Sequence, residues 1–356
     1  MTILPAIFEP KWKRYPLTCG HPHARRWIRS CAQLGLANNT ISAYAFSLEG
    51  FLNFCRPRGL DILTLGRAEI LEYLAHLRTS VSRRTVGADT PAGNRLSNAT
   101  LHQRLTAVRL FFQFLVEDEV RTVNPVKQGR YSRSMHQGAR GLLPVFHKLP
   151  WIPSEEQWAA LLAVVARSSI RNRCMLAFAY DAALRREELC QLRSDDIDPA
   201  QRVIRIRAEN TKSRRERILP YSEITGTLLR QYLRHRSGLS RQRGPLFLSE
   251  SPRNFSASIT LWTWSKVVRA IALQAGVPDF STHTLRHLCL TDLARAGWGL
   301  HEISQLAGHR SLETTKLYVH LSARDLSQRF QATMDQVHAW RLETLSATAP
   351  SSGLLQ

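Results

Sequence analysis

Apolar residues recur at helical spacing through the first third of the chain, which predicts a helical bundle. One stripe follows Asn residues that can cap a helix, and it consists of Ile41, Tyr44, Leu48, Phe51 and Leu52. Similar stripes predict helices over Thr64–Arg78 and Asn98–Glu117. Residues 1–36 are rich in basic residues and proline, so we expect them to be irregular apart from a short helix near Arg25–Leu34.

The periodic pattern stops at Asn124-Pro125. Residues 126–150 carry five Lys or Arg side chains among several Gly and Pro residues and show no period, which is typical of an interdomain linker. Such a linker can follow a phosphate backbone or simply be solvated. A second domain then opens with Ser154-Glu-Glu-Gln157, a capping box ahead of a new apolar stripe.

The second domain combines several helices with a small sheet. Alternation over Arg202–Ala208, with Ile204 and Ile206 on one face, predicts a strand that a turn at Glu209–Arg215 joins to a second strand at Arg217–Tyr221. Predicted helices cover Arg171–Ala183, Arg186–Leu192, Ile259–Ala275, His283–Ala296, Leu300–Ala307 and Ser311–His320. The pattern therefore predicts a mainly α protein with a small antiparallel β-sheet, built as a helical domain followed by a mixed α+β domain.

A last amphipathic stripe lies near the C-terminus, over Asp325–Trp340. Such a helix can pack on its own domain or on another protomer, and the stripe does not distinguish the two. The final ten residues, rich in Ser, Ala and Leu, look frayed.

Charge adds the first functional indication. The 356 residues contain 49 Lys plus Arg and 28 Asp plus Glu, which gives 49 − 28 = +21. A polyanion is the natural partner of such a chain, and nucleic acid is the first candidate because phosphate neutralisation releases counterions. A membrane is the weaker alternative, because no apolar run approaches the roughly 18 residues of a spanning helix. No signal peptide is evident at the N-terminus, so we expect a soluble, cytoplasmic protein.

Metal ligation is not favoured by the sequence. The six cysteines are scattered without a CxxC pair, and most lie in apolar helical contexts where a reduced thiol packs as a small hydrophobe. Cys19, His21, His23 and Cys31 match no common zinc spacing. The acidic run Asp195-Asp196-Ile-Asp198 is better explained as a helix-to-strand turn with local hydrogen bonds than as a metal site. We expect no metal and no cofactor.

Four local features could carry chemistry, although each is weak alone. They are Arg185 with Glu188 on a turn between helices, Lys212 at a basic hairpin tip, His283 with Arg286 on one helix face, and Gly-His309 ahead of Tyr318. Taken singly, these residues are better explained as a surface ion pair, a solvated lysine, a chance spacing in an Arg-rich chain and a half-buried core tyrosine.

In order along the chain, the four features resemble the signature of the tyrosine recombinase (phage integrase) family. The similarity includes L-R-x-x-E-L around Arg185, K-x-x-x-x-R from Lys212, H-x-L-R-H from His283, and a Gly-His pair followed nine residues later by Tyr318. It extends over roughly residues 38–320, because the helices before Asn124-Pro125 resemble the family's core-binding domain.

The resemblance implies a site made of Arg185, Lys212, His283, Arg286, His309 and Tyr318. Tyr318 would attack the scissile phosphate, Arg185 and Arg286 would clamp its oxygens, and Lys212 would protonate the departing 5′-oxygen. His283 would accept the phenol proton, and His309 would donate a hydrogen bond to the phosphate. An unperturbed phenol is only about 0.1% ionised at neutral pH, so we expect nearby positive charge to activate it.

The sequence departs from the family pattern at two places. Ala183 stands where many relatives have Gly, and Thr211 and Ser213 flank Lys212 where many relatives have Gly. Arg214 and Arg215 are close rivals to Lys212 in the hairpin. Arg186 is a rival to Arg185.

The same resemblance implies an organisation and partners. We expect an N-terminal extension at 1–37, a core-binding domain at 38–125, a linker at 126–150, a catalytic domain at 151–322 and a C-terminal helix and tail at 323–356. The partners would be double-stranded DNA with specific recombination sites, further copies in a tetrameric synapse, and accessory DNA-bending proteins. The enzyme would act in the cytoplasm on the nucleoid. The alternatives are a type IB topoisomerase-like DNA-relaxing enzyme and a non-catalytic, sequence-specific DNA-binding protein.

Overall fold

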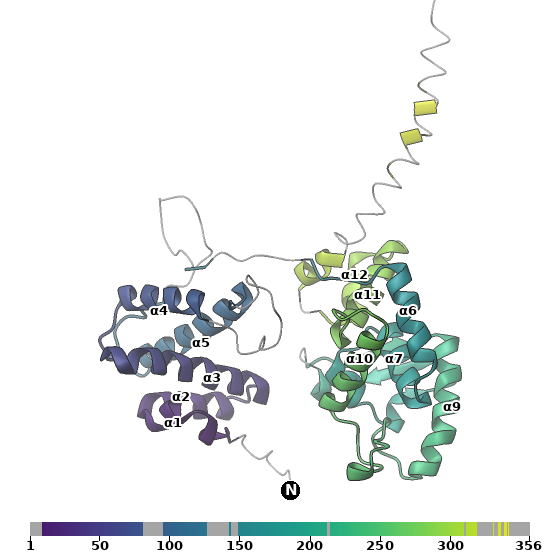
Figure 1. Cartoon of the computed structure of the whole chain (residues 1–356), viewed down its shortest axis with the longest axis horizontal. Coiled ribbons are helices and arrows are strands. Elements are labelled where there is room, and N and C mark those ends of the chain that lie inside the picture. Colours follow the sequence, from purple (N-terminus) through teal and green to yellow (C-terminus); the bar gives the residue numbers. More distant parts are fainter. Residues whose placement is uncertain are drawn as a thin grey trace, which may run out of the picture. The chain divides into compact units, whose positions relative to one another are not determined.

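The computed structural model describes residues 9–80, 95–126, 142–143, 149–211, 214–309 and 311–318, with isolated positions between 330 and 341. The chain forms two compact units, Met1–His147 and Lys148–Gln356 (Figure 1). Four sequence predictions fall wholly or mainly outside the described residues. They are Lys212, most of the linker at 126–150, most of the helix at Asp325–Trp340, and the final ten residues.

The first unit is a helical bundle around an aromatic core. Phe51 meets Tyr73 and Phe112 edge-on, with ring centroids 4.9 and 5.8 Å apart. Its helices are α1 (Pro16–Gly20), α2 (Pro22–Gln33), α3 (Asn38–Cys55), α4 (Arg67–Thr79) and α5 (Asn98–Glu117), with short 3-10 turns at Trp12–Arg14 and Arg56–Arg58. The three helices predicted beyond residue 38 are confirmed, and α5 has the predicted bounds.

Helices α1 and α2 belong to the same core, where the sequence predicted a largely irregular segment. Trp27 stacks on Tyr44 of α3 at 5.6 Å, and Ile28 and Cys31 are buried beside it. The hydroxyl of Thr18 and two backbone amides of α1 donate to the carboxylate of Glu49. The short helix predicted near Arg25–Leu34 is confirmed as α2, which begins earlier, at Pro22. The expectation of an irregular segment was wrong for α1, because the carboxylate of Glu49, a distant residue of α3, holds this turn in place.

The second unit surrounds a three-stranded antiparallel sheet with helices. The strand order is β1 (Ile197–Asp198), β2 (Val203–Ile206) and β3 (Arg217–Pro220), with Ile204 opposite Leu219 and Ile206 opposite Arg217. Ile204 and Ile206 are buried and Arg205 is exposed, as the alternation predicted.

Helices cover the sheet of the second unit. They are α6 (Glu155–Ala166), α7 (Ile170–Asp181), α8 (Arg186–Cys190), α9 (Glu223–Leu239), α10 (Leu261–Gln274), α11 (Thr282–Arg295) and α12 (Leu300–Ala307), with 3-10 turns at Ser194–Asp196, Ala208–Asn210 and Pro252–Asn254. Residues 312–318 are also helical.

Helix α9 was missed by the sequence analysis, although it packs closely on α7. Its buried face contains Leu229, Tyr232 and, unexpectedly, Arg236. The guanidinium of Arg236 donates to four backbone carbonyls of the segment 240–246, which satisfies its hydrogen-bonding groups inside the unit. A charged residue at a core position breaks the apolar stripe that marks a helix in the sequence.

The acidic run at 195–198 forms a local turn, as predicted. The carboxylate of Asp196 is buried and accepts from the backbone N–H of Arg193 and from Nε of Arg207 at 2.9 and 2.6 Å. Asp198 accepts from the amides of Ala200 and Gln201. Across the described ranges, no group of three or more His, Cys, Asp or Glu residues is arranged to hold a metal ion.

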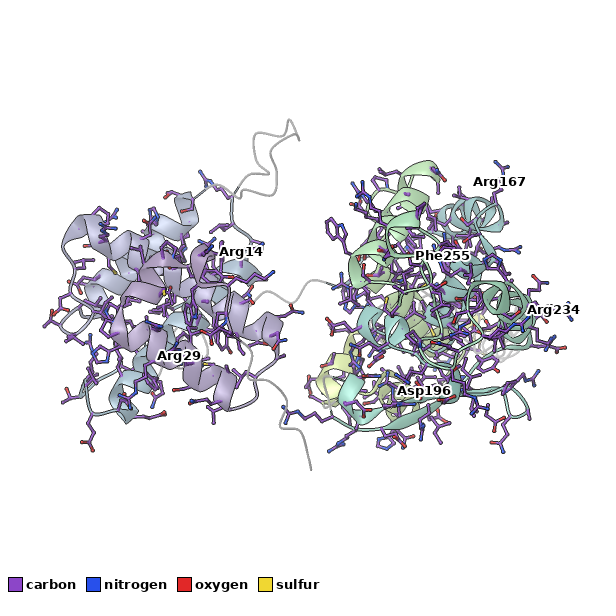
Figure 2. The ribbon with its side chains drawn as sticks, turned by 90° about the horizontal axis from the view of Figure 1, so that it is seen from below. Arg14, Arg29, Arg167, Asp196, Arg234 and Phe255 are labelled. Atoms are coloured by element: carbon purple, nitrogen blue, oxygen red, sulfur yellow. The ribbon has the colours of Figure 1, made fainter. Side chains whose placement is uncertain are left out.

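The basic surplus is spread over the surfaces of both units. Figure 2 shows exposed arginines in each, such as Arg14 and Arg29 in the first unit and Arg167 and Arg234 in the second.

All six cysteines are free thiols, and five of them are buried. In the part of the chain that the structure describes, no helix is both long and apolar enough to cross a membrane.

Candidate active site

Helix α11 supplies the centre of the site. Its N-cap, Ser281, accepts from the amide of Thr284, and the following turn places His283, Arg286 and His287 on one face. The Arg286 side chain is only 2% exposed. Its Nη1 donates to the carbonyl of Ala183 at 2.6 Å and its Nη2 to that of Ala307 at 2.5 Å, so neighbouring backbone from two other segments holds the guanidinium in place.

The turn between α7 and α8 supplies a second guanidinium. Ala183 is buried and adopts a left-handed backbone with φ of 46°, the conformation that favours Gly at this position in many relatives. The chain then reaches Arg185, whose Nη2 donates to the carbonyl of Gly308 at 3.2 Å. Arg186 points elsewhere and donates to the hydroxyl of Ser265. Of these two adjacent arginines, Arg185 is the one that faces the site.

A buried carboxylate orients the arginines. Glu188 is 1% exposed, and its oxygens accept from Nη1 of Arg185 at 2.9 Å and from Nη1 and Nη2 of Arg217 at 3.1 and 2.7 Å. Burial raises the pKa of Glu188. The hydrogen bonds and charges of Arg217 and Arg185 together lower it by more than burial raises it, so the pKa lies below its ordinary value. Glu188 is therefore an ionised orienting group, whereas the sequence indicated only a surface ion pair with Arg185.

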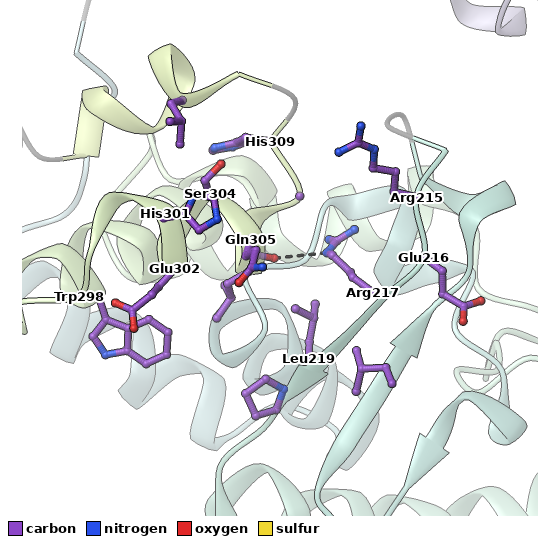
Figure 3. Close-up of a pocket in the computed structure, with 15 residues that line it drawn as sticks. Arg215, Glu216, Arg217, Leu219, Trp298, His301, Glu302, Ser304, Gln305 and His309 are labelled. Atoms are coloured by element: carbon purple, nitrogen blue, oxygen red, sulfur yellow. Dashed lines mark hydrogen bonds between the residues drawn. The ribbon is translucent and has the colours of Figure 1, made fainter.

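Gly308 ends α12 and lets β3 approach. It has φ of 61°, and a Cβ atom at this position would lie 3.1 Å from Nη1 of Arg217. Nε of Arg217 donates to the carbonyl of Leu306 at 3.3 Å. A pocket of about 850 Å³ opens between β3 and α12, and it meets the site at Arg217, Gly308 and His309 (Figure 3).

His309 has a defined tautomer in this arrangement. Its Nε2 lies 3.0 Å from Nη2 of Arg286 and its Nδ1 lies 2.9 Å from Oγ1 of Thr315. Because a guanidinium can only donate, Nε2 accepts, and the ring proton of the neutral imidazole sits on Nδ1 and is donated to Thr315. Burial, followed by the charges of Arg286, Arg185 and Arg217, lowers the pKa of His309 to about 3.

Tyr318 closes the site from helical residues 312–318. Its side chain is 2% exposed, and its ring lies parallel to that of His309 with centroids 6.0 Å apart. The phenol oxygen is 2.9 Å from Nδ1 of His287. Burial raises the pKa of Tyr318, and the opposing charges of Arg286 and Arg185 do not cancel that effect. The phenol is therefore protonated at neutral pH in this arrangement, so its attack on a phosphate requires a proton acceptor in addition to the nearby positive charge.

The structure brings five of the six sequence-predicted residues together, namely Arg185, His283, Arg286, His309 and Tyr318. Lys212 lies outside the described residues. Sequence reasoning gave Glu188 only an ion pair with Arg185, and it assigned no role to Arg217 and His287. The H-x-L-R-H pattern contained the signal for His287, because residues four apart share a helix face.

The electrostatics of the site favour an anion. Arg185, Arg217 and Arg286 contribute three positive charges against the single negative charge of Glu188, which gives 3 − 1 = +2. Burial and the adjacent arginines lower the pKa of His283, so it adds no charge near neutral pH. A phosphodiester beside Arg185 and Arg286 would offset part of this surplus and place its phosphorus near a phenol.

Two family models and several curated relatives match this chain. The model of the phage integrase family matches residues 153–324, and the phage integrase N-terminal SAM-like domain matches residues 31–119. The chain is 30% identical over 253 residues to tyrosine recombinase XerC of Chlamydia trachomatis serovar L2, covering 69% of this chain and 73% of the relative. It is 29% identical over 305 residues to tyrosine recombinase XerD of Shewanella oneidensis, covering 83% and 91%.

Solved structures share the fold. The Tn1549 transposon integrase in complex with transposon right end DNA has a TM-score of 0.64 at 18% identity, covering 88% of this chain and 99% of that one. The XerH site-specific recombinase bound to palindromic difH substrate has a TM-score of 0.62 at 18% identity, covering 86% and 83%.

Proposed function

This chain belongs to the tyrosine recombinase (phage integrase) family, and we propose that it cleaves and rejoins duplex DNA at specific sites through Tyr318. The observation that carries the proposal is the buried surplus of positive charge around Arg286. Arg286 contacts His309, and the ring of His309 lies parallel to the phenol ring of Tyr318. A phosphodiester is the anion that such a site suits, because planar guanidinium groups bind two phosphate oxygens at once.

The proposed reaction is a transesterification. The Tyr318 oxygen attacks the scissile phosphorus, the bond to the 5′-oxygen breaks, and a 3′-phosphotyrosine remains. Arg185 and Arg286 hold the non-bridging oxygens and stabilise the charge that develops in the transition state. These guanidinium groups supply the positive charge that divalent metal ions supply in other phosphoryl-transfer sites. One phosphodiester replaces another, so the step is reversible and needs no ATP.

Two further roles belong to the proposal. Lys212 protonates the departing 5′-oxygen from the tip of the β2–β3 hairpin, as the family resemblance implies. His309 donates a hydrogen bond to the bound phosphate. For this, its Nε2 must lose the hydrogen bond that it accepts from Arg286 and carry a proton instead. A phosphate that takes over the Arg286 donor would permit that exchange.

The organisation follows the same proposal. The first unit would clamp DNA with its helices, the second unit would perform the chemistry, and the +21 charge would support binding to the phosphate backbone. Cleavage of two duplexes in one recombination event calls for a tetrameric synapse, which accessory DNA-bending proteins would help to assemble. We place this activity in the cytoplasm, on the nucleoid.

A covalent-adduct experiment tests the proposal. Footprinting of DNA that flanks the chain's own gene supplies the protected segment, and a duplex of that sequence nicked near the cleavage point traps the phosphotyrosine. We expect adducts with the unmodified chain, and none with Tyr318→Phe, which should keep its footprint because only the hydroxyl is lost. Adducts of undiminished yield in Tyr318→Phe would refute Tyr318 as nucleophile.

A further inference from the structure

We propose that His287, rather than His283, takes the proton from Tyr318 when the phenol attacks phosphate. This inference rests on the proposed function, in which Tyr318 is the nucleophile. Nδ1 of His287 lies 2.9 Å from the phenol oxygen, within the range for direct proton transfer. Among the described residues, no hydrogen bond joins His283 to Tyr318.

The helix and its neighbours fix this contact. Arg286, adjacent to His287 in sequence, is tied to the carbonyls of Ala183 and Ala307, so α11 cannot rotate without losing both bonds. The His287 ring contacts both of the other rings: the His283 ring meets it edge-on with centroids 4.6 Å apart, and the Tyr318 ring centroid lies 5.7 Å away. Within the described ranges, His283 makes a ring contact with His287 and none with Tyr318.

The groups around His287 keep its imidazole in the neutral form, which has a free nitrogen that can accept a proton. The titratable and charged groups facing it are His283 and Arg286 on α11, His309 after α12, and Tyr318. None of them is a carboxylate. Burial, and then His283 and Arg286, lower the pKa of His287 to about 4, so the imidazole is neutral at pH 7. A neutral ring has one unprotonated nitrogen, and the phenol O–H is the donor that faces Nδ1.

The proton balance of the step is complete. As the Tyr318 oxygen bonds to phosphorus and the bond to the 5′-oxygen breaks, the phenol proton moves to Nδ1 of His287. The 5′-oxygen takes its proton from the proposed acid, Lys212. The phosphate that enters beside Arg286 counters the positive charge that disfavours a histidine cation. In rejoining, the 5′-hydroxyl attacks and His287 returns its proton to the departing tyrosine.

Asparagine separates proton acceptance from positioning, because its amide oxygen can accept the phenol hydrogen bond but cannot take the proton at neutral pH. We compare His287→Asn with His283→Asn and with His235→Asn, a control on the exposed side of α9. The readout is the single-turnover rate of adduct formation on the nicked duplex. We expect His287→Asn to be slower by about 100-fold at pH 7, with the loss shrinking as pH rises toward the phenol pKa. His235→Asn should match the unmodified chain.

A fluorinated tyrosine at position 318 completes the test, since a more acidic phenol needs no proton acceptor. It should restore most of the rate in His287→Asn and not in His283→Asn.

The outcomes separate the inference from the proposed function. Absence of adducts with the unmodified chain would defeat the proposed function itself. Adducts with the unmodified chain together with a normal rate in His287→Asn would overturn the inference alone. A pH-independent loss without rescue would also overturn it, because His287 would then only position Tyr318. If His287→Asn unfolds, His287→Gln is assayed in the same way.

Discussion

The guanidinium of Arg217 on β3 binds both carboxylate oxygens of Glu188 on α8, at 2.7 and 3.1 Å. Arg185, the N-cap of α8, donates to the same carboxylate at 2.9 Å. The two arginines also donate to the carbonyls of Gly308 and Leu306, so Glu188 links α8 through them to the hairpin and to the end of α12.

Replacing Glu188 with Ala should destabilise the second unit strongly. Two arginines would lose their buried partner, and an uncompensated buried charge costs about 3–5 kcal/mol. The free energy of unfolding in urea measures the effect. Glu187→Ala is the matched control, because Glu187 is exposed on the same short helix. Equal losses in both variants would show that Glu188 is not an orienting group.

Gly308→Ala should reduce both stability and DNA cleavage. The left-handed backbone costs a non-Gly residue about 1–2 kcal/mol, and the new methyl group would crowd Arg217. Gly276→Ala isolates the first effect, because Gly276 has φ of 69° and a Cβ atom added there would meet nothing within 4 Å. We expect similar backbone penalties in the two variants but slower adduct formation in Gly308→Ala alone. Equal cleavage rates would mean that Arg217 tolerates displacement.

Sulfate should bind the site in place of a phosphodiester. A ligand at ten times its Kd stabilises the folded state by about 1.4 kcal/mol, or roughly 3–5 °C in the Tm of a unit of this size. Thermal unfolding in sulfate and chloride at equal ionic strength gives the difference. Arg185→Ala should lose the specific part of the gain, whereas Arg186→Ala, which removes a contact with Ser265 outside the site, should keep it. A gain of equal size in both variants would place sulfate elsewhere.

Acid should weaken the second unit below pH 6.5. The folded pKa values of His309 and His287 are about 3 and 4, whereas the unfolded value is about 6.5. Between these values the unfolded chain binds more protons, so the free energy of unfolding falls as pH falls from 6.5 toward 4. Measured in urea at several pH values, the slope should be smaller in His309→Asn than in the unmodified chain. An unchanged slope would show that His309 titrates normally in the folded state.

Local sequence determined most of the helices, because caps and apolar spacing act within a few residues. Ser154 caps α6 through the predicted box, and α5 has the predicted bounds. Prediction failed where a distant partner allowed a local rule to be broken. Helix α9 buries Arg236, and the short helix α1 is held by the carboxylate of Glu49 on α3. Both become understandable only when the carbonyls that accept from Arg236 and the carboxylate that accepts from α1 are in place.

The site divides in the same way. The order and spacing of Arg185, His283, Arg286, His309 and Tyr318 along the chain were enough to indicate the family and the phosphate chemistry. Tertiary packing alone decided that the phenol faces His287, that Nε2 of His309 accepts from Arg286, and that Glu188 is buried between two arginines. Spacing along a helix can place side chains on one face, but which of them meets a residue from another segment depends on how the elements pack. Burial, which sets the pKa of each group, is fixed only at that stage.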